Sequence, residues 1–366
     1  MHIPYINLKA QWEDEKKRLL PIIESVMAGG VFVGGPQVNQ FERNVEVAFG
    51  VKHCVALNSG TDALICALYA LGVSRGDEVI TTPNSFIAST AAIVHLGAVP
   101  IFVDVLSDQN IDDSRIEAAI TTKTKVIMPV HLTGRMANMY AIDKIAKEYN
   151  LKVIEDCAQA IGSKLHDKYS GSFGDIGCFS CHPLKNLNAC GDSGFLVTQD
   201  TDSAEKIKKF RNHGLVDRNN VKSFGTVSRM DELQAAILNF RIKKLPSVIE
   251  KRRQHAKEFI DGLDSKNIFI PTERDGQFNS YHTFVIQTEP RDALQTFLKS
   301  ENIETAIHYP IPIHLQPAAA RLGYKKGDFE VAERQAQQIL TLPINQYLKE
   351  GSIKRIVSLI NKFCEG

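Results

Sequence analysis

Apolar positions in the first two-thirds of the chain alternate between short unbroken runs and runs with helical spacing. Short runs with apolar residues at their centre predict strands at residues 53–58, 78–82, 100–105, 125–130, 152–155, 177–180 and 194–198. Helical spacing predicts two N-terminal helices, ending at Gly29-Gly30 and at Phe49, and three more at 61–71, 88–96 and 138–149. This alternation indicates an α/β domain whose parallel or mixed sheet is covered by helices on both faces.

The pattern changes in the last third of the chain. Helical spacing is continuous from residue 229 to about 253, and a polar stretch follows at 261–277. Beyond it we expect a strand at 283–288, a helix at 291–300, a strand-like segment at 305–309 and a final helix at 353–363. The sequence therefore predicts a large domain over residues 1–245, including the N-terminal segment, and a smaller α+β domain over 246–366.

Composition excludes several classes of protein. The 366 residues are 43% hydrophobic and 23% charged, and the formal net charge is +1. A charge so close to zero lacks the basic footprint of a nucleic-acid-binding protein. No apolar run approaches the roughly 18 residues that span a bilayer, and the N-terminal segment has no apolar signal core. We therefore expect a cytoplasmic protein with no nucleic-acid and no membrane partner.

The seven cysteines raise the question of a metal or haem site. Cys178-Phe-Ser-Cys181-His182 matches the pattern for covalent haem attachment, and Cys190 could complete a set of metal ligands with His182. Haem attachment normally occurs outside the cytoplasm, and thiolate metal sites usually place their pairs on short turns separated by longer loops. Reduced thiols and no metal are therefore the expected state.

One lysine follows a predicted strand. Lys185 comes shortly after the strand at 177–180 and before the turn Gly191-Asp-Ser-Gly194. Ligands of α/β proteins usually bind at the carboxyl ends of the strands, and lysine is the residue that forms Schiff bases with carbonyl compounds. By itself, a lysine at such a place is more often a solvated surface residue.

Three further features are each ambiguous alone. Asp156 ends a buried strand, where an acid can pair with a protonated pyridine nitrogen or simply cap a helix. The junction Asn58-Ser-Gly-Thr-Asp62 places a glycine turn before a helix, which favours a phosphate but also fits a plain helix start. Phe86 could stack on a cofactor ring or belong to the core.

The order and spacing of these features resemble the DegT-type (DegT/DnrJ/StrS) sugar-nucleotide aminotransferases, a branch of the fold type I enzymes that use pyridoxal 5′-phosphate (PLP). The resemblance runs over nearly the whole chain. The similar segments are 34–42, 58–64, 76–86, 153–159, 174–180, 182–187, 211–214 and 308–314.

The resemblance implies a site and a reaction. It implies that Lys185 carries PLP as a Schiff base and shuttles protons, and that Asp156 binds the pyridine nitrogen. The other cofactor contacts that it implies are Phe86 on the ring, Gln159 against the ring or its oxygen, Gly60, Thr61 and Ser180 on the phosphate, and Arg229 near the partner's site. The substrates are then an amino acid, L-glutamate above all, and a nucleotide-linked keto sugar, and the enzyme is a homodimer with its active sites at the interface.

Substrate contacts are less defined. His308 and His314 resemble residues that line the sugar-nucleotide entrance, although a proline-rich surface loop would also explain them. The N-terminal Ile6-Asn-Leu-Lys9-Ala-Gln11 resembles the subgroup that acts on 3-keto sugars more than the 4-keto subgroup. We therefore favour amination at C3.

One position departs from the family. Relatives usually carry Gly-x-Asn-x-Arg where this chain reads Gly225-Thr-Val-Ser-Arg229. In those relatives the asparagine donates a hydrogen bond to the PLP phosphate of the partner subunit, and Val227 has no such donor. Ser228, Asn219, Asn220 or a bridging water could replace it.

Two other functions remain open on the same scaffold. PLP-dependent sugar-nucleotide dehydratases resemble this family but replace the Schiff-base lysine with histidine, whereas this chain has Lys185. A non-catalytic, PLP-binding regulator is the other alternative, because fold alone does not establish function.

Overall fold

A seven-stranded sheet forms the centre of the larger domain in this computed structural model, which describes residues 2–264 and 266–365. The strand order is β1-β9-β8-β5-β4-β2-β3, and only β9 runs against the other strands. The strands are β1 His53–Leu57, β2 Glu78–Thr81, β3 Val99–Phe102, β4 Thr124–Ile127, β5 Lys152–Asp156, β8 Ile176–Ser180 and β9 Gly194–Thr198. The mixed sheet that the sequence predicts is confirmed.

Alternating side chains of each strand pack into helices on opposite faces of the sheet. On one face, Val55, Ile154 and Leu196 share a core with α3 (Gly60–Ala70), α4 (Ile87–His95) and α6 (Thr201–Phe210). On the other face, Ala56 and Phe195 contact residues of α2 (Pro36–Phe49) and α7 (Glu232–Arg241), while Val153 packs with α5 (Met139–Glu148). Successive side chains of these strands point to opposite faces and nearly all are buried, which is why helices cover both faces.

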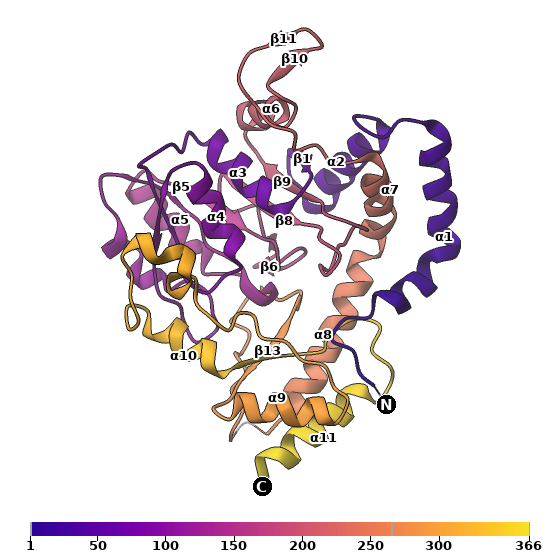
Figure 1. Cartoon of the computed structure of the whole chain (residues 1–366), viewed down its shortest axis with the longest axis vertical. Helices are drawn as coiled ribbons and strands as arrows, with labels where there is room; N and C mark the ends of the chain where they lie inside the picture. The colour runs from indigo at the N-terminus through magenta and orange to yellow at the C-terminus, as the bar shows by residue number, and fades with distance from the viewer. Residues whose placement is uncertain (1, 265, 366) are drawn as a thin grey trace.

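The smaller domain is built on two antiparallel strands, β13 (Phe284–Gln287) and β14 (Ile339–Leu342). They share a core with α8 (Leu245–Gly262), α9 (Arg291–Ser300) and α11 (Ser352–Glu365). In Figure 1, α8 runs from the larger domain down into the smaller domain. Helix α10 (Glu330–Gln338) lies on the other side of β13 from α8 (Figure 1). The start of the N-terminal segment, which we expected in the larger domain, contacts the smaller one: Ile3 bridges to Ile303 and is buried in the core of the smaller domain.

Two predicted elements differ from the structure. The continuous helix expected over residues 229–253 is divided into α7 and α8 by a 3-10 turn at Ile242–Lys244. Pro246 occupies the first turn of α8, where its missing N–H costs no helical hydrogen bond. The strand expected at 305–309 is reduced to a single bridge between Ala306 and Thr341.

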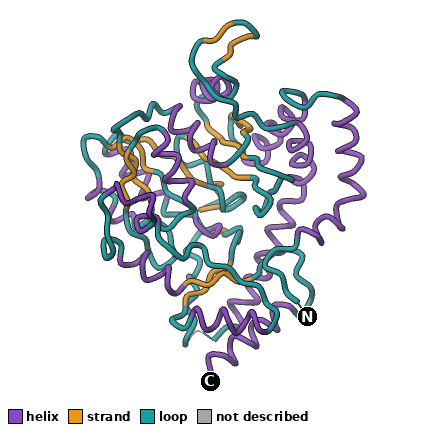
Figure 2. Tube along the Cα trace, in the orientation of Figure 1, coloured by secondary structure: helices purple, strands orange, loops and turns teal. Residues whose placement is uncertain are grey.

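A hairpin projects from the larger domain. Its strands are β10 (Leu215–Asp217) and β11 (Asn220–Val221), and Figures 1 and 2 show it standing clear of the rest of the chain. Shorter pairings join β6 (Lys164–Leu165) to β7 (Lys168–Tyr169) and to β12 (Gln277–Phe278). Helix α1 (Leu8–Gly29) lies along the opposite flank from α5. Among the described residues, no helix has the length and apolar character needed to cross a membrane.

Candidate active site

Three strand ends bring the predicted cofactor residues to one edge of the sheet. In the register of β1, β9 and β8, Leu57 lies opposite Gly194, which lies opposite Ser180. Asp156, at the end of β5, pairs with Cys178 of β8. The start of α3, Asp156 and Ser180 are therefore neighbours at the carboxyl edge of the sheet, which is the usual ligand-binding edge of such folds.

The start of α3 forms an anion cradle against Ser180. Helix α3 begins at Gly60, and Ser59 caps it by accepting the Asp62 N–H at 3.1 Å. A Cβ on Gly60 would lie 2.7 Å from the Cβ of Ser180, so glycine is required for this close approach. The first N–H groups of a helix have no partner within the helix and attract a phosphate, so the first turn of α3, which contains Gly60 and Thr61, is suited to bind an anion.

Asp156 is the buried acid of the site. Its carboxylate accepts a hydrogen bond from Ser89 Oγ at 2.7 Å and another from the Ala158 N–H at 3.1 Å. Burial raises the pKa of this carboxyl group, and the two hydrogen bonds and the charge of Lys185 oppose the rise. A carboxyl group held at two points in a buried site can share a proton with a ring nitrogen. Ser89 is a site residue that the sequence reasoning missed.

Lys185 lies within electrostatic reach of Asp156, on the loop that follows β8. Burial lowers the pKa of its amine to about 8, against the opposing effects of Asp156 and Cys181. Lysine titrates near 10.4 in model peptides, so the burial makes the neutral, nucleophilic amine far more abundant at physiological pH. Desolvation is one of the physical means by which enzymes activate a lysine nucleophile.

Aromatic and amide side chains form the walls of the site. The ring of Phe86 lies 5.8 Å from the ring of Tyr309, centroid to centroid, and Phe86 remains 55% exposed. Gln159 accepts the Thr133 N–H at 2.8 Å through Oε1 and donates from Nε2 to the Tyr309 hydroxyl at 3.4 Å. Tyr309 was missed in the sequence because an aromatic residue in a proline-rich loop carries no distinctive spacing.

Arg229 lies beside the end of β1, where it bridges to Leu57. Its guanidinium donates to Asn212 Oδ1 at 2.9 Å. Val227 is 49% exposed and bridges to Asn212 through the backbone. Ser228, in contrast, is fully buried and donates to Asn58 Oδ1 at 3.2 Å. The hydroxyl of Ser228 is therefore engaged within its own chain, whereas position 227 faces outward.

Two histidines of the smaller domain lie within electrostatic reach of the lysine. His308 contacts Thr341 Oγ1 through Nδ1 at 3.0 Å, and burial followed by the charge of Lys185 lowers its pKa to about 4. Burial, again with a contribution from Lys185, holds the pKa of His282 well below its usual range. Both imidazoles are therefore neutral at pH 7. The sequence pointed to His308 but not to His282, whose neighbours in the sequence carry no distinctive motif.

The other two candidate substrate residues lie elsewhere. His314 is only 2% exposed, and its Nε2 lies 3.0 Å from Glu333 Oε1 while its ring packs against Phe329. The prediction that His314 lines the substrate entrance therefore does not fit the structure, because its side chain is enclosed in a separate core. Lys9 is exposed in the first turn of α1.

The cysteines of the haem-like pattern do not converge. Cys178 belongs to the core on one face of the sheet, and Cys181 belongs to the core on the other. Burial raises the pKa of both thiols, which favours the neutral form, and Cys190 is exposed. Among the described residues, the only cluster with metal-like spacing is His131, Glu155 and Cys157.

That cluster is a hydrogen-bonding centre. The Ala137 N–H donates to His131 Nδ1, so the proton of the imidazole is on Nε2, which donates to Glu155 at 2.9 Å. Glu155 also accepts the N–H groups of residues 171, 173 and 174. These four donors already occupy the carboxylate oxygens. The cluster therefore fixes the turn before β8.

The donor set fits PLP. Backbone N–H groups and Ser180 suit its phosphate, Asp156 suits its ring nitrogen, and Phe86 offers an exposed ring face. Lys185 supplies an amine for its aldehyde. A glycine at position 60 leaves free the space that a Cβ would occupy beside Ser180.

Comparison with known proteins agrees with this geometry. The model of the DegT/DnrJ/EryC1/StrS aminotransferase family matches residues 13–361. A "pleiotropic regulatory protein" of Geobacillus stearothermophilus is 41% identical over 99% of each chain. A "UDP-N-acetyl-3-dehydro-alpha-D-glucosamine 3-aminotransferase" of Acidithiobacillus ferrooxidans is 40% identical, over 100% of this chain and 98% of its own.

Solved structures extend the likeness to the fold and the cofactor. The crystal structure of DesV from S. venezuelae superposes with a TM-score of 0.98 at 35% identity, over 100% of this chain and 99% of DesV. A related structure contains PMP, the aminated form of PLP. The fold is thus that of the fold type I enzymes, as predicted. The chain belongs to the DegT/DnrJ/EryC1/StrS aminotransferase family of PLP-dependent enzymes.

Proposed function

We propose that this protein transfers the amino group of L-glutamate to C3 of a nucleotide-linked 3-keto sugar. The observation that carries the proposal is the position of Lys185, a partly buried amine within electrostatic reach of the buried acid Asp156, at the edge of the sheet that also holds the anion cradle. The amino sugar produced would serve the synthesis of a surface glycan such as lipopolysaccharide O-antigen, or of a related glycoconjugate.

Each residue of the site has a defined task. PLP, when bound, supplies an electron sink for the carbon that carries the exchanged amino group. Lys185 Nζ holds the cofactor and carries the proton that is exchanged at the substrate carbon. Asp156 holds a proton at the ring nitrogen, with its carboxylate oriented by Ser89 and the Ala158 N–H. Gly60, Thr61 and Ser180 bind the phosphate.

The preference for C3 rests on the relatives and on the N-terminal segment. The name of the Acidithiobacillus relative specifies a 3-dehydro sugar, and further relatives whose names specify a 3-amino or a 3-oxo sugar are 35–37% identical to this chain. The segment Ile6–Gln11 of this chain also resembles the 3-keto subgroup. Both UDP-linked and dTDP-linked sugars occur among these names, so we leave the nucleotide open.

The proposal includes a homodimer in which the projecting hairpin reaches the partner. Phe224 is 98% exposed, and Val216, Val221 and Val227 are each about half exposed on the same projection. Apolar side chains grouped on an arm that stands clear of the body mark a binding surface. The arm continues directly into Arg229 at the end of β1, so a partner bound there would lie close to the site. A second copy of this chain is the occupant that we propose.

A regulatory role is the second candidate function. It is favoured by the name of the Geobacillus relative, which is 41% identical. A regulator has no need for an amine of lowered pKa beside a buried acid, and that feature favours the enzyme. Because Lys185 is a lysine and not a histidine, the site also lacks the substitution that marks the related dehydratases.

A half-reaction screen tests the proposal. The protein would first be converted to its aminated cofactor form with L-glutamate and then mixed with nucleotide-linked 3-keto and 4-keto sugars. We expect the visible band of the aldehyde cofactor to return with the 3-keto sugars only. The Lys185→Ala variant should lose about 10²- to 10⁴-fold in rate while remaining folded. A visible band without turnover of any amino donor would favour the regulator, and a band restored by 4-keto sugars would overturn the preference for C3.

A further inference from the structure

The loop that carries Lys185 has no secondary structure of its own. Residues 181–193, all of them described, connect β8 to β9 without a helix or a strand. Backbone hydrogen bonds close the base of the loop, Cys181 N–H to Ser193 O and Ala189 N–H to Cys181 O, and form one turn at its middle, Lys185 N–H to His182 O. The position of this turn relative to the sheet depends on contacts with other elements, and one of these is the 3.0 Å hydrogen bond from Asn186 Nδ2 to the Ser280 carbonyl.

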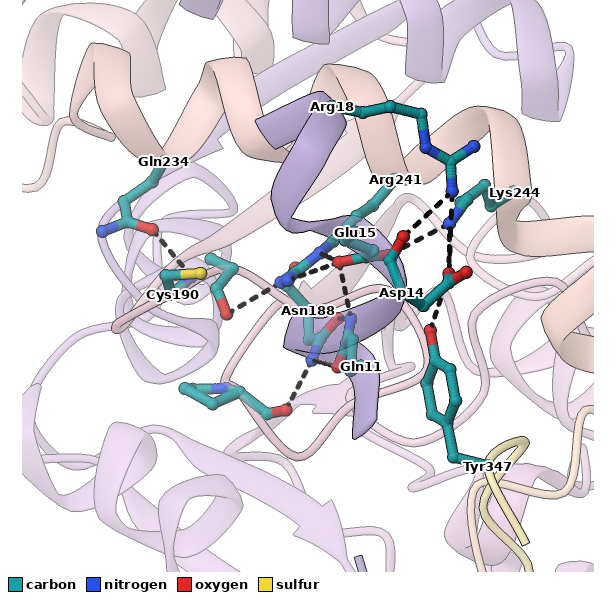
Figure 3. Close-up of polar contacts among 12 residues, drawn as sticks. Gln11, Asp14, Glu15, Arg18, Asn188, Cys190, Gln234, Arg241, Lys244 and Tyr347 are labelled. Atoms are coloured by element: carbon teal, nitrogen blue, oxygen red, sulfur yellow. Dashed lines mark hydrogen bonds and ion pairs between the residues drawn. The ribbon is translucent and has the colours of Figure 1, made fainter. Parts of the chain in front are cut away.

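A buried amide pair binds this loop to helix α1. Gln11 Nε2 donates to Asn188 Oδ1 at 3.0 Å, and Asn188 Nδ2 donates to Gln11 Oε1 at 3.0 Å (Figure 3). The same Asn188 amide donates to the Pro183 carbonyl at 2.7 Å. Gln11 and Asn188 are 6% and 5% exposed. Asn188 thus joins the two arms of the loop, one on each side of Lys185, and holds both against α1.

A buried ion pair adds a second attachment. The Arg241 guanidinium, on α7, lies 2.8 Å from Glu15 on α1 and donates to the Asn188 carbonyl, also at 2.8 Å. It reaches the Ala189 carbonyl at 3.4 Å. Figure 3 shows Glu15 and Arg241 meeting above Asn188 and Gln11. Hydrogen bonds between charged groups in a buried site are short and specific, so this pair fixes the direction as well as the distance.

We propose that Gln11, Glu15, Asn188 and Arg241, named here the α1 latch, position the amine of Lys185 for its reaction. None of the four is a catalytic residue; they act through the loop that they hold. The inference rests on the proposed function, since it assigns Lys185 the role of the reacting amine. It also gives α1 a function, because a displacement of that helix would be transmitted to the lysine through Gln11.

An adjacent set of contacts offers an internal comparison. Asp14, on the same helix, accepts from Lys244 at 2.9 Å and from the Tyr347 hydroxyl at 3.5 Å (Figure 3). Asp14 is about half exposed, and its side-chain partners among the described residues all lie outside residues 181–193. Its partner Lys244 also lies 3.5 Å from Glu15, so the loss of Asp14 disturbs the ion pairs of α1 without removing a contact of the loop. A general loosening of α1 would therefore appear in both variants, whereas release of the loop would appear only when Gln11 is changed.

The test compares Gln11→Leu with Asp14→Asn in the full-length, cofactor-loaded protein. Gln11→Leu keeps the size of the side chain and removes both amide bonds. We expect kcat to fall about tenfold with little change in KM for the amino donor, since small misplacements of a reacting group reduce rate more than binding. Hydrogen exchange over residues 183–189 should become faster by about tenfold or more. Asp14→Asn should change neither quantity.

Exchanging the two amide residues should restore the contact and the activity. The double variant Gln11→Asn with Asn188→Gln keeps the same amide groups with one methylene exchanged, and it should recover most of the lost kcat and slow the exchange again. If Gln11→Leu does not fold, Gln11→Met keeps the length of the side chain and removes both amide bonds without adding a charge beside Glu15, and the same comparison applies. Exchange and kcat equal to those of Asp14→Asn would overturn the latch. Failure of the proposed function would look different, with faster exchange in a protein that turns over no amino donor.

Discussion

The hydroxyl of Ser89 donates to Oδ2 of Asp156 at 2.7 Å, and this bond joins α4 to the end of β5 inside the site. Ser89 is 2% exposed and Asp156 is 4% exposed, so water cannot replace the donor. The bond favours the ionised carboxylate and opposes the rise in pKa that burial causes. Ser89 therefore controls the lower end of the pH range in which Asp156 can hold the ring nitrogen.

Ser89→Ala should move that limit upward. Without the hydroxyl, the pKa of Asp156 rises further, so the carboxyl group becomes protonated at a higher pH. A hydrogen bond to a charged group contributes roughly 1.5 to 3 kcal/mol, which corresponds to about 1 to 2 pH units. The acid limb of the kcat–pH profile measures the shift. Thr90→Ala is the matched control, because the neighbouring Thr90 is equally buried and its hydroxyl has no partner among the described residues. Equal profiles for both variants would contradict the role of Ser89.

The pKa of Lys185 predicts its reactivity in the cofactor-free protein. Burial lowers that pKa to about 8, so the amine becomes neutral as the pH rises through about 8 and not near 10.4. The rate at which an amine reagent labels Lys185, followed by peptide mass spectrometry, should rise with that midpoint. In Asp156→Asn the midpoint should be lower, because the charge of Asp156 raises the pKa of Lys185. A midpoint near 10 in the wild type would show that Lys185 is solvated.

The strands and the residues at their ends could be predicted from the sequence because their signals are local. A short apolar run such as Val153-Ile154 identifies a buried strand; Asp156 ends that strand, and Lys185 follows the strand at 177–180 after a few residues. The direction in which the side chain of a loop residue points cannot be predicted from its neighbours in the sequence. His314 lies six residues beyond His308, yet a 3-10 turn at Ile313–Leu315 directs it into a core with Glu333.

Contacts between distant segments of the chain also could not be predicted from the sequence. Gln11 and Asn188 are 177 residues apart, and nothing in either neighbourhood predicts their pairing. Strand β14 was missed because its four residues, three of them apolar, follow α10 directly, without a glycine or proline to mark the change. The resemblance to a family supplied the roles of Gly60, Ser180 and Gln159, which isolated residues could not reveal.

The projecting hairpin predicts how the proposed homodimer can be broken. Phe224→Asp places a charge at the most exposed apolar side chain of the arm, and it should convert the dimer to a folded monomer. Light scattering coupled to size exclusion would give the mass. Ile260→Asp is the control, since Ile260 is 45% exposed on α8, in the smaller domain and far from the hairpin in Figure 1. A Phe224→Asp protein of unchanged mass would place the interface elsewhere or exclude the dimer.

Val227 leaves the cofactor site without a hydrogen-bond donor that relatives have at this position. It is half exposed beside Asn212, in the place where relatives have an asparagine that donates across the dimer. Ser228 is a poor replacement for the missing donor, because its hydroxyl already donates to Asn58 Oδ1 at 3.2 Å. Asn219 and Asn220 on the exposed hairpin, or a bridging water, remain as donors.

Val227→Asn should therefore restore a donor and tighten cofactor binding. A hydrogen bond to a charged group contributes roughly 1.5 to 3 kcal/mol, so the dissociation constant should fall by about ten- to a hundredfold. The effect should be greatest for the aminated cofactor, which is not tethered to Lys185, and calorimetric titration of the cofactor-free protein with each form would measure it. Val227→Leu, which adds no donor, should bind as the wild type does. Equal affinity in Val227→Asn and Val227→Leu would mean that a donor is already in place, and Asn219→Ala or Asn220→Ala would then weaken binding of the aminated form.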